Sequence, residues 1–508
     1  MVATAVAVVA CTLSGTVLDH IMNQAGTPAV CVRGAVSGTS VLSGAPDALA
    51  ADIAGSLLGC APEVVVANAS SQADVATAVT VAEQDHAPLL LSSLLTTASS
   101  RGGPGTQQPQ LTAASGTAAV REISALHPRN VLAIGLTAGD LSAELPGSSV
   151  TAYPAGLPAM SRPALRKHVV VLVHAGQSPA AMAASATAEA VGATVVAVNG
   201  YDPRGDPAAI AALDAARPRE VIAVGAGFGP ESRLASRLGV VMTGVQLPGG
   251  GQLIVPTHRI VALYGCPGVP ALGALGQQGP QASVTKAEQA AAPYRALSTV
   301  PVIPAFEIIA TVATAAPGAD GGYSAQTPIA ALTPWVRAAT AAKMYVILDL
   351  QPGRDSFLAQ AKEYESLLRL PNVGLALDPE WKLQPGQLPL QQIGSVSIAE
   401  VNSVVSWLGQ LTAQYRLPQK LLVLHQFKIG EIANEQQLDT SSDNVAVVLD
   451  MDGQGAPAVK QQTWDAITSS APPGVPFGWK NFYVKDQPML TPSQTMASTP
   501  QPVMISYE

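Results

Sequence analysis

The stretch YVILDLQPGRDSFLAQAKEYESLLRLPNVGLALDPEW, residues 345–381, contains two apolar runs, Tyr345–Leu348 and Val373–Leu377, and the segment between them is long enough for a helix. An acidic residue directly follows each run, Asp349 after the first and Asp378 after the second. Apolar strands that alternate with helical segments predict a parallel sheet covered on both faces. We therefore expect this strand–helix–strand unit to recur along the chain.

The alternation continues from residue 259 to the last residue of the sequence. Its eight apolar runs are Ile260–Tyr264, Val302–Phe306, Tyr345–Leu348, Val373–Leu377, Leu421–Leu424, Val445–Leu449, Gly478–Tyr483 and Val503–Ser506. Eight such strands in about 250 residues are typical of a closed (β/α)8 barrel. One connecting helix begins with Ser397 and Glu400 at the spacing of a capping box. We predict a TIM-type barrel over residues 257–508, without the usual last helix because the sequence ends at the eighth strand.

In barrels of this type, catalytic side chains stand at the carboxyl ends of the strands. Acids, aromatic residues and amides occupy those positions here, although charged residues make up only 12% of the chain. The candidate site residues are Glu307, Asp349, Asp378, Glu380, Trp381, His425, Gln426, Asp450, Asp452 and Tyr483. We expect them to converge on one rim of the barrel.

Several acids on one rim suit glycoside hydrolysis, because one carboxyl group must protonate the glycosidic oxygen while another is ionised. Glu380 is the predicted general acid, since an indole wall such as Trp381 raises a carboxyl pKa and can stack on a sugar. Asp378 and Asp450 are predicted to act as base or nucleophile. The residues predicted to bind substrate or tune the acids are Glu307, Asp349, Trp381, His425, Gln426, Asp452 and Tyr483.

Other interpretations of the rim stay open. The acids can form ion pairs with Arg354, Lys382, Lys428 or Lys480. A divalent cation would have Asp349, Asp378, Asp450 and His425 as its ligands. The sequence has no HxxxH or HExxH motif, however, and the barrel has no G-x-S-x-G motif, so we predict no metal, no cofactor and no nucleophilic triad. A phosphosugar enzyme would need a glycine-containing turn after strand seven or eight, and residues 485–488 contain no glycine.

An internal repeat organises the first half of the chain. The strands of the first copy are Glu63–Ala67, Ala87–Leu91 and Val131–Gly135, and those of the second are Val169–Val173, Thr194–Val198 and Val221–Gly225. Both copies close with the pattern PR-x-V-[LI]-A-[IV]-G, and a helix in each carries an Ala-Glu pair. The repeat predicts tandem Rossmann-like α/β units over residues 26–155 and 156–250.

The first copy resembles the type 2 cell-wall-binding repeat of Gram-positive surface proteins. The matching residues are Ala67–Ala78, Ala87–Leu91 and Val131–Gly135. The second copy departs from the family at Ser178–Ala181, where the Ala-Asp pair is missing. Such repeats hold secondary wall polymers, so the resemblance implies association with the cell envelope and no chemistry. Without the resemblance, Asp74 is explained as a carboxylate that complements a helix dipole.

Two glycine-rich stretches have other interpretations. Gly225–Gly229 follows a strand, as a phosphate-binding turn does, but it lacks the GxGxxG spacing and an acidic ribose ligand. We therefore predict no dinucleotide site. The run Pro248–Gln252 is predicted to be the linker into the barrel.

Composition excludes two classes of protein. With 48% hydrophobic residues and 12% charged residues, the chain is too apolar for intrinsic disorder. Lys and Arg number 27 against 35 Asp and Glu, which gives a net charge of -8. Because nucleic acids are bound chiefly through clustered cations, we predict no nucleic-acid partner.

The N-terminus and the cysteines bear on location. Residues 1–18 carry no charge, so residues 1–25 are predicted to be part of an export signal or membrane anchor, although the basic head of a signal peptide is missing. A buried first helix is the alternative. Val8–Cys11 loosely resembles a lipoprotein cleavage box. In an oxidising compartment Cys31 and Cys60 are expected to form a disulfide, and two buried thiols are the alternative.

The barrel resembles an uncharacterised group of secreted actinobacterial proteins. The segments that carry the resemblance are VPVIPAFEIIATV at 300–312, ILDLQPGR at 347–354, LALDPEW at 375–381 and LVLHQF at 422–427. The resemblance implies an envelope location and brings no activity. We therefore expect an extracytoplasmic protein, secreted or tethered to the membrane at its N-terminus, whose barrel cleaves an envelope polysaccharide. The alternative is a non-catalytic glycan-binding or scaffold protein with a degenerate barrel.

Overall fold

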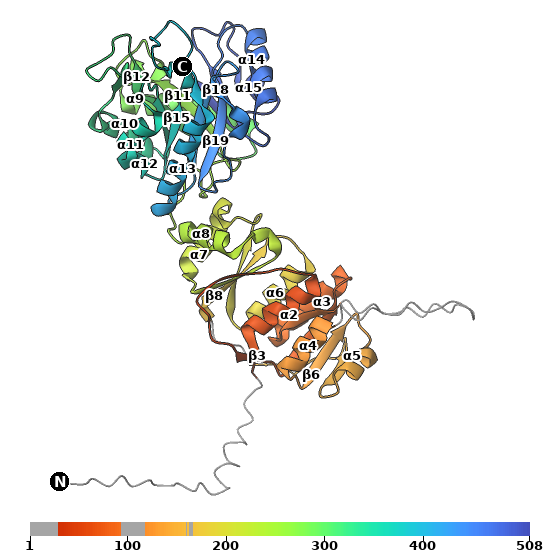
Figure 1. The fold of residues 1–508 in the computed structure, drawn as a ribbon. Coiled ribbons are helices and arrows are strands. Elements are labelled where there is room, and N and C mark those ends of the chain that lie inside the picture. Colours follow the sequence, from red (N-terminus) through yellow and green to blue (C-terminus); the bar gives the residue numbers. More distant parts are fainter. Residues whose placement is uncertain (1–28, 93–116, 159, 162–165) are drawn as a thin grey trace, which may run out of the picture. The chain divides into compact units, whose positions relative to one another are not determined.

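The computed structural model describes residues 29–92, 117–158, 160–161 and 166–508, so the predicted export or anchor segment lies outside the described residues. The chain divides into two compact units (Figure 1). The first contains the described residues up to Tyr201 together with Ala216–Glu231, and the second contains Asp202–Ala215 and Ser232–Glu508. Within the described ranges, no helix is both long enough and apolar enough to cross a membrane.

The first unit contains two parallel sheets, as the sequence predicts, and each sheet has four strands where the repeat predicts three. One has the strand order β5–β4–β6–β7, with β4 at Glu63–Asn68, β5 at Leu89–Ser92, β6 at Asn130–Ile134 and β7 at Ser149–Ala152. The helices of this copy are α3 (Gln72–Asp85), α4 (Thr117–Leu126) and α5 (Ala138–Glu144). Helix α3 begins where Ser71 Oγ accepts the backbone N–H of Asp74 at 3.2 Å, which satisfies one of the free donors at the helix start.

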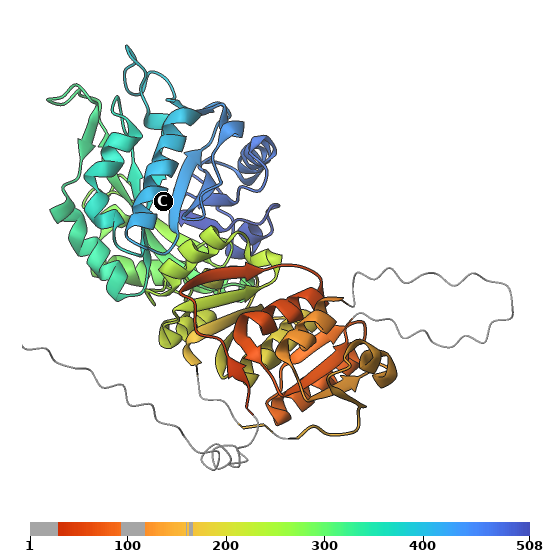
Figure 2. The ribbon, with the colours of Figure 1, turned by 60° about the horizontal axis from the view of Figure 1, so that its bottom comes forward.

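The second sheet has the order β2–β10–β8–β9, with β2 at Gly38–Leu42, β8 at Arg166–His174, β9 at Ala193–Val198 and β10 at Glu220–Val224. Strands β8, β9 and β10 take the places that β4, β5 and β6 have in the first sheet, which confirms the repeat. Strand β2 takes the place of β7, although it precedes the whole first copy in sequence. It pairs in parallel with β10, from Gly38 opposite Glu220 to Leu42 opposite Val224, and its red ribbon lies beside the yellow-green strands in Figure 2.

The two sheets of this unit share one hydrophobic core. Helix α2 (Pro46–Leu57) packs against α4 of the first copy and against α6 (Pro179–Ala190) of the second. On α6, the hydroxyl of Thr187 accepts the N–H of Leu89 at 3.0 Å and donates to its carbonyl at 3.1 Å. The two copies are therefore joined through their interior and not by a linker alone.

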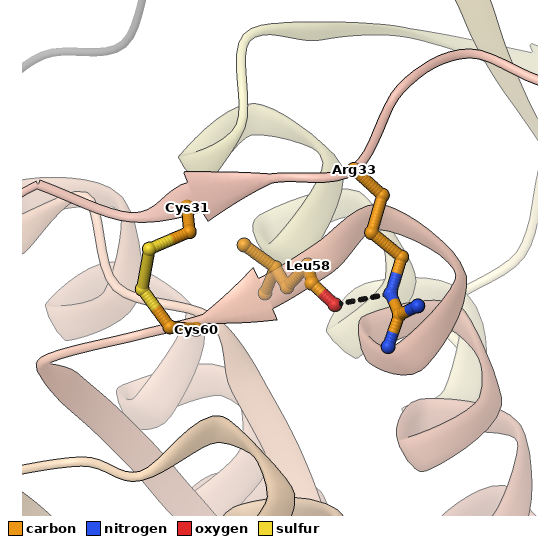
Figure 3. The surroundings of a disulfide bond; sticks show 4 residues. All are labelled: Cys31, Arg33, Leu58 and Cys60. Atoms are coloured by element: carbon orange, nitrogen blue, oxygen red, sulfur yellow. Dashed lines mark hydrogen bonds between the residues drawn. A yellow bond between two sulfur atoms is a disulfide. The ribbon is translucent and has the colours of Figure 1, made fainter.

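A disulfide joins Cys31 to Cys60, as expected for an oxidising compartment (Figure 3). The short antiparallel strands β1 (Cys31–Val32) and β3 (Leu58–Cys60) hold the two cysteines opposite each other. Beside the bond, Arg33 Nε donates to the carbonyl of Leu58 at 2.7 Å. Because disulfides persist mainly outside the cytosol, the bond points to an extracytoplasmic location.

The second unit confirms the predicted barrel. Its eight parallel strands are β11 (Arg259–Gly265), β12 (Val302–Ala313), β14 (Tyr345–Leu350), β15 (Val373–Leu377), β17 (Lys420–Gln426), β19 (Val445–Met451), β20 (Phe477–Asn481) and β21 (Met504–Tyr507). Each strand pairs with the next, and β21 pairs with β11, which closes the sheet. The surrounding helices are α9 (Pro280–Ala291), α10 (Ile329–Ala341), α11 (Phe357–Glu363), α12 (Glu365–Leu368), α13 (Ile398–Gln414), α14 (Pro457–Ser470) and α15 (Pro492–Met496) (Figure 1).

Two details of the barrel differ from the sequence-based expectations. Strand β12 runs seven residues past Phe306 and forms a hairpin with the antiparallel strand β13 (Ser324–Gln326), which projects from the carboxyl end of the barrel. At the start of α13, Ser397 Oγ accepts the N–H of Glu400, but the Glu400 carboxylate bonds the N–H of Phe357 at 2.8 Å. Only half of the predicted capping box is therefore formed.

The amino end of the barrel is closed by packed side chains. Helices α7 (Pro207–Ala216) and α8 (Glu231–Val241) precede the barrel in sequence. After them, Leu247 and Ile254 join the apolar cluster inside the barrel. Gln252 between them is fully buried and donates to the carbonyls of Val240 and Val245 at 3.1 and 2.8 Å. The glycine-rich run predicted to be a linker is thus a packed connection.

Candidate functional site

A buried histidine lies at the centre of the carboxyl end of the barrel. His425, near the end of β17, is 2% exposed. Its Nε2 lies 3.1 Å from Oε1 of Glu307 on β12, and its Nδ1 lies 3.3 Å from Oδ2 of Asp450 on β19. Asp349 on β14 follows, with Oδ1 3.9 Å from the same Nε2. The barrel therefore brings these four sequence-predicted residues together.

The charges of this cluster decide its protonation. Burial disfavours an imidazolium, but the Glu307 carboxylate and the contact with Asp450 outweigh it, so the pKa of His425 is raised well above its ordinary value. Burial raises the pKa of Glu307, and it raises the pKa of Asp349 to about 6. The cluster is thus a protonated histidine between carboxylates. These charge pairs hold the carboxyl ends of the strands that carry them in fixed positions.

Lys480, on β20, is a second buried cation. Its Nζ lies 3.1 Å from Asp452 Oδ1, 3.0 Å from Glu508 Oε2 and 3.5 Å from the ring centroid of Tyr264. The Tyr264 hydroxyl in turn donates to Asp349 Oδ2 at 2.8 Å, which links the lysine to the histidine cluster. Burial opposes the ammonium, but the charges of Asp452 and Glu508 raise the pKa of Lys480 well above its ordinary value. Asp452 therefore has a permanent cation beside it.

Next to this network the rim opens into a pocket of about 250 Å³, called here the rim pocket. Its polar lining includes Asp378, Glu380, Asp452 and Lys480, and Trp381 forms part of its apolar wall. One carboxylate oxygen from each of Asp378, Glu380 and Asp452 lies within 4.8 Å of the other two. Three acids thus meet in an accessible cavity, which is the arrangement expected of paired acid and base groups.

Glu380 is held at the pocket by a tight turn. It lies on the single-turn helix η5 (Pro379–Trp381) directly after β15. The N–H of Gly394 donates to the Glu380 carbonyl at 2.7 Å, and a Cβ at Gly394 would lie 2.4–2.6 Å from three carbonyl oxygens, so only glycine fits there. Within the described chain, the Glu380 carboxylate has neither a hydrogen bond nor an ion pair. Burial, followed by the charge of Asp452, raises the pKa of Glu380 to about 7.

Asp378 has a different environment from Asp452. It is 2% exposed, and its closest hydrogen-bonding partner is Gln351, whose Nε2 lies 3.5 Å from Oδ2. Burial and the neighbouring charge of Glu380 raise the pKa of Asp378 well above its ordinary value. Burial thus favours the protonated form of Glu380 and of Asp378, whereas Asp452 lies 3.1 Å from the ammonium group of Lys480.

The three clustered carboxyl groups have the oxygen donors that a divalent cation prefers. They are also the group among the described residues with ligand-like spacing. However, Lys480 Nζ already lies 3.1 Å from Asp452 Oδ1, and burial raises the pKa of Asp378 and of Glu380. Lys480 is therefore a cation that already lies beside one member of this donor set.

The predicted residues divide between the pocket and its surroundings. Asp378, Glu380, Trp381 and Asp452 line the pocket. Glu307, Asp349, His425 and Asp450 form the buried cluster beneath it. Gln426 is buried beside Glu435, and Tyr483 is 42% exposed and stacks on Tyr507 with ring centroids 5.5 Å apart. Neither Gln426 nor Tyr483 lines the pocket.

Sequence reasoning gave no site role to several residues of the site. They are Tyr264, Phe427, Lys480, Phe482 and Glu508. Each lies at or next to the carboxyl end of a barrel strand, and this position is the sequence feature by which they can be found. A search for acids alone passes over Tyr264, and the sequence indicates Lys480 only as an ion-pair partner. Comparison of the chain with protein-family models, with curated proteins and with solved structures finds no match.

Proposed function

We propose that this protein is an exported cell-envelope protein whose barrel hydrolyses a glycosidic bond in an envelope polysaccharide. One observation carries the proposal. Glu380, with a pKa of about 7, lies in an open pocket beside Trp381, within 4.8 Å of the ion-paired carboxylate of Asp452. A protonated acid next to an ionised one is the arrangement that glycosidases use.

The chemistry follows from the two acids. Glu380 donates its proton to the glycosidic oxygen as the bond from that oxygen to the anomeric carbon breaks. Asp452, with an oxygen within 4.8 Å of an oxygen of Glu380, forms a covalent bond to the anomeric carbon as the glycosidic bond breaks, as the nucleophile of a retaining enzyme does at a carboxyl separation of about 5–5.5 Å. Glu380, now ionised, removes a proton from water, and the water oxygen displaces Asp452 to complete hydrolysis.

This assignment uses Asp452 in the role for which the sequence suggested Asp378 or Asp450. Asp450 contacts His425 in the buried cluster and does not line the pocket. Asp378 is buried and has a strongly raised pKa, so it is a poor nucleophile at neutral pH. Asp452 combines access to the pocket with a cation at 3.1 Å.

The extracytoplasmic location is supported by the Cys31–Cys60 disulfide. For the first unit we propose attachment to wall polymer through the copy that resembles cell-wall-binding repeats. Tethering of the N-terminus to the membrane stays a proposal for residues 1–25. We expect no nucleic-acid partner, because the net charge of -8 disfavours phosphate backbones.

One observation favours a second candidate, a non-catalytic glycan-binding barrel. Lys480 bridges Asp452 and Glu508 at 3.1 and 3.0 Å, and ion pairs of this kind can hold rim acids in a purely structural role. In that case the pocket would bind sugar without cleaving it.

The experiment that separates the two candidates is sugar release from a panel of purified bacterial envelope glycans. Wild type would be compared with Glu380→Gln, Asp452→Asn and, as a matched control at an exposed position on α14, Asp465→Asn. Release that is lost in the first two variants supports hydrolysis. If no glycan is cleaved while both variants still bind glycan as wild type does, the catalytic proposal fails and the binding barrel remains.

A further inference from the structure

A second pocket adjoins the rim pocket and shares two of its wall residues. This pocket, called here the outer pocket, has a volume of about 320 Å³. Glu380 and Trp381 line both pockets. The proposed proton donor therefore stands where the two cavities meet, which is where the bond of a ligand that fills both would lie.

The walls of the outer pocket are two projections from the barrel rim. One carries Tyr323, in the loop between β12 and β13, and the other is the segment 389–393 after η5. The Arg354 guanidinium lies 4.6 Å from the Tyr323 ring centroid and donates to the carbonyl of Gln387 at 3.0 Å, so it ties the two projections together. A Cβ at Gly353 would lie 2.2 Å from the carbonyl of Gly322, which shows how closely the first projection packs against the turn after β14.

The second projection displays apolar side chains to solvent. Leu390 is 79% exposed and has a φ of 62°, and Ile393 is 43% exposed. A leucine in the left-handed region is strained, and such strain persists where surrounding structure imposes it, often at binding sites. Exposed apolar groups on a strained segment inside a pocket are better explained by a ligand than by packing.

The lining of the outer pocket selects the kind of ligand. Tyr323, Trp381 and Leu390 offer flat or apolar faces, and Gln391 offers an amide for hydroxyl groups. Neither lysine nor arginine lines this pocket, and Arg354 is engaged behind Tyr323. A carboxylate or phosphate on the ligand would thus lose its hydration without gaining a cation. A neutral sugar, with apolar ring faces and hydroxyl edges, matches these walls.

We propose that the two pockets are consecutive subsites for a neutral oligosaccharide that spans both, with its scissile bond at Glu380. The inference rests on the proposed function for the cleavage and adds the ligand class. It implies that sugar rings are bound on both sides of the cleaved bond. It also implies that affinity grows when a ligand becomes long enough to reach the outer pocket.

The test measures binding by calorimetry to the full chain carrying Glu380→Gln, which prevents turnover. The probes are neutral gluco-, manno- and arabino-oligosaccharides of one, two, four and six rings, and oligogalacturonides of the same lengths as an acidic series. We expect at least one neutral series to bind tenfold or more tightly at four rings than at one, and the acidic series to show no such gain. Adding Leu390→Asp should reduce that gain to less than twofold.

Val459→Asp in the same background is the matched control, since Val459 is 53% exposed on α14 and lines neither pocket. Its length dependence should equal that of the parent, and circular dichroism should show both aspartate variants folded. Affinity that is independent of length, a gain confined to the acidic series, or a gain unaffected by Leu390→Asp overturns the inference. If wild type still releases sugar from an envelope glycan in that case, the proposed hydrolase function is retained and the proposed subsites are rejected. If affinity grows with ligand length but no glycan is cleaved, the proposed subsites are supported and the proposed hydrolase function is rejected.

Discussion

Oε1 of Glu307 lies 3.1 Å from Nε2 of His425, and neither side chain is more than 1% exposed. The imidazole is held on its other side by Asp450, so strands on opposite sides of it are joined through one buried ring. The residues of the rim pocket rest on this ring cluster through Tyr264 and Lys480. The cluster therefore holds the candidate acids in position.

Replacing His425 by Asn should destabilise the barrel by about 3–5 kcal/mol, because removal of one member of a buried ion pair leaves the others uncompensated. Tryptophan fluorescence during urea unfolding measures this change, since all five tryptophans of the chain lie between residues 335 and 479. His127→Asn, at an exposed position in the first unit, should leave the transition unchanged. If His425→Asn unfolds at the same urea concentration as wild type, the charge of His425 does not stabilise the barrel.

Activity should depend on pH through Glu380. A general acid must carry its proton, so kcat/KM for sugar release should be level below about pH 7 and fall tenfold per pH unit above it. Glu380→Gln should lower kcat by about 10²–10⁴ and abolish this alkaline limb. A profile that rises through pH 7 would instead make Glu380 a base.

Stability of the barrel should decrease as pH rises from about 4.5 to 8. Burial raises the pKa of Glu431 from 4.5 to about 8, and the other raised carboxyl pKa values act in the same direction. The folded state then binds more protons than the unfolded state, so the slope of unfolding free energy against pH is negative. Urea unfolding at pH 5, 7 and 9 checks the sign.

Glu431→Gln should make that slope shallower, because its amide oxygen can still accept the N–H of Phe427 that the carboxylate accepts at 2.9 Å. Glu363→Gln, at an exposed position on α11, should leave the slope as it is. If unfolding free energy changes with pH equally in Glu431→Gln and Glu363→Gln, Glu431 does not cause the pH dependence of stability.

The Cys31–Cys60 disulfide should stabilise the first unit by about 3–4 kcal/mol, the entropy cost of closing a loop of its length in the unfolded chain. The double variant Cys31→Ser, Cys60→Ser should lose this amount in far-UV circular dichroism melts and urea titrations. Dithiothreitol should destabilise wild type to the same extent and leave the double variant unaffected. A response of the double variant to the reductant would assign the effect to another cause.

The barrel was predictable because its strands are continuous apolar runs, and the rim because an acid follows several of them. Which acids reach the pocket depends on where each strand ends to within a residue or two. Strand β19 continues to Met451, so Asp450 stays inside the barrel and Asp452 emerges. The long hairpin at the end of β12 has no marker in a run such as Val302–Phe306, so the outer pocket that it walls was not predictable.

The pairing of β2 with β10 could not be predicted from the sequence for a different reason. Its sequence is short and weakly apolar, and its pairing with β10 joins residues about 180 positions apart, a distance that local patterns do not encode. The disulfide partners Cys31 and Cys60 are only 29 positions apart, within reach of a pattern-based argument.

Strand β2 also sets an order of events during biosynthesis. A chain that leaves the ribosome or an export channel from its N-terminus presents Gly38–Leu42 early, yet the edge that receives this strand exists only after Val224 has emerged. The complete first copy can form in the interval, whereas β2 must wait unpaired. We expect the first unit to finish folding late, as a single closure around the second copy, so a nascent chain that stalls before residue 224 exposes an unpaired strand to chaperones and proteases.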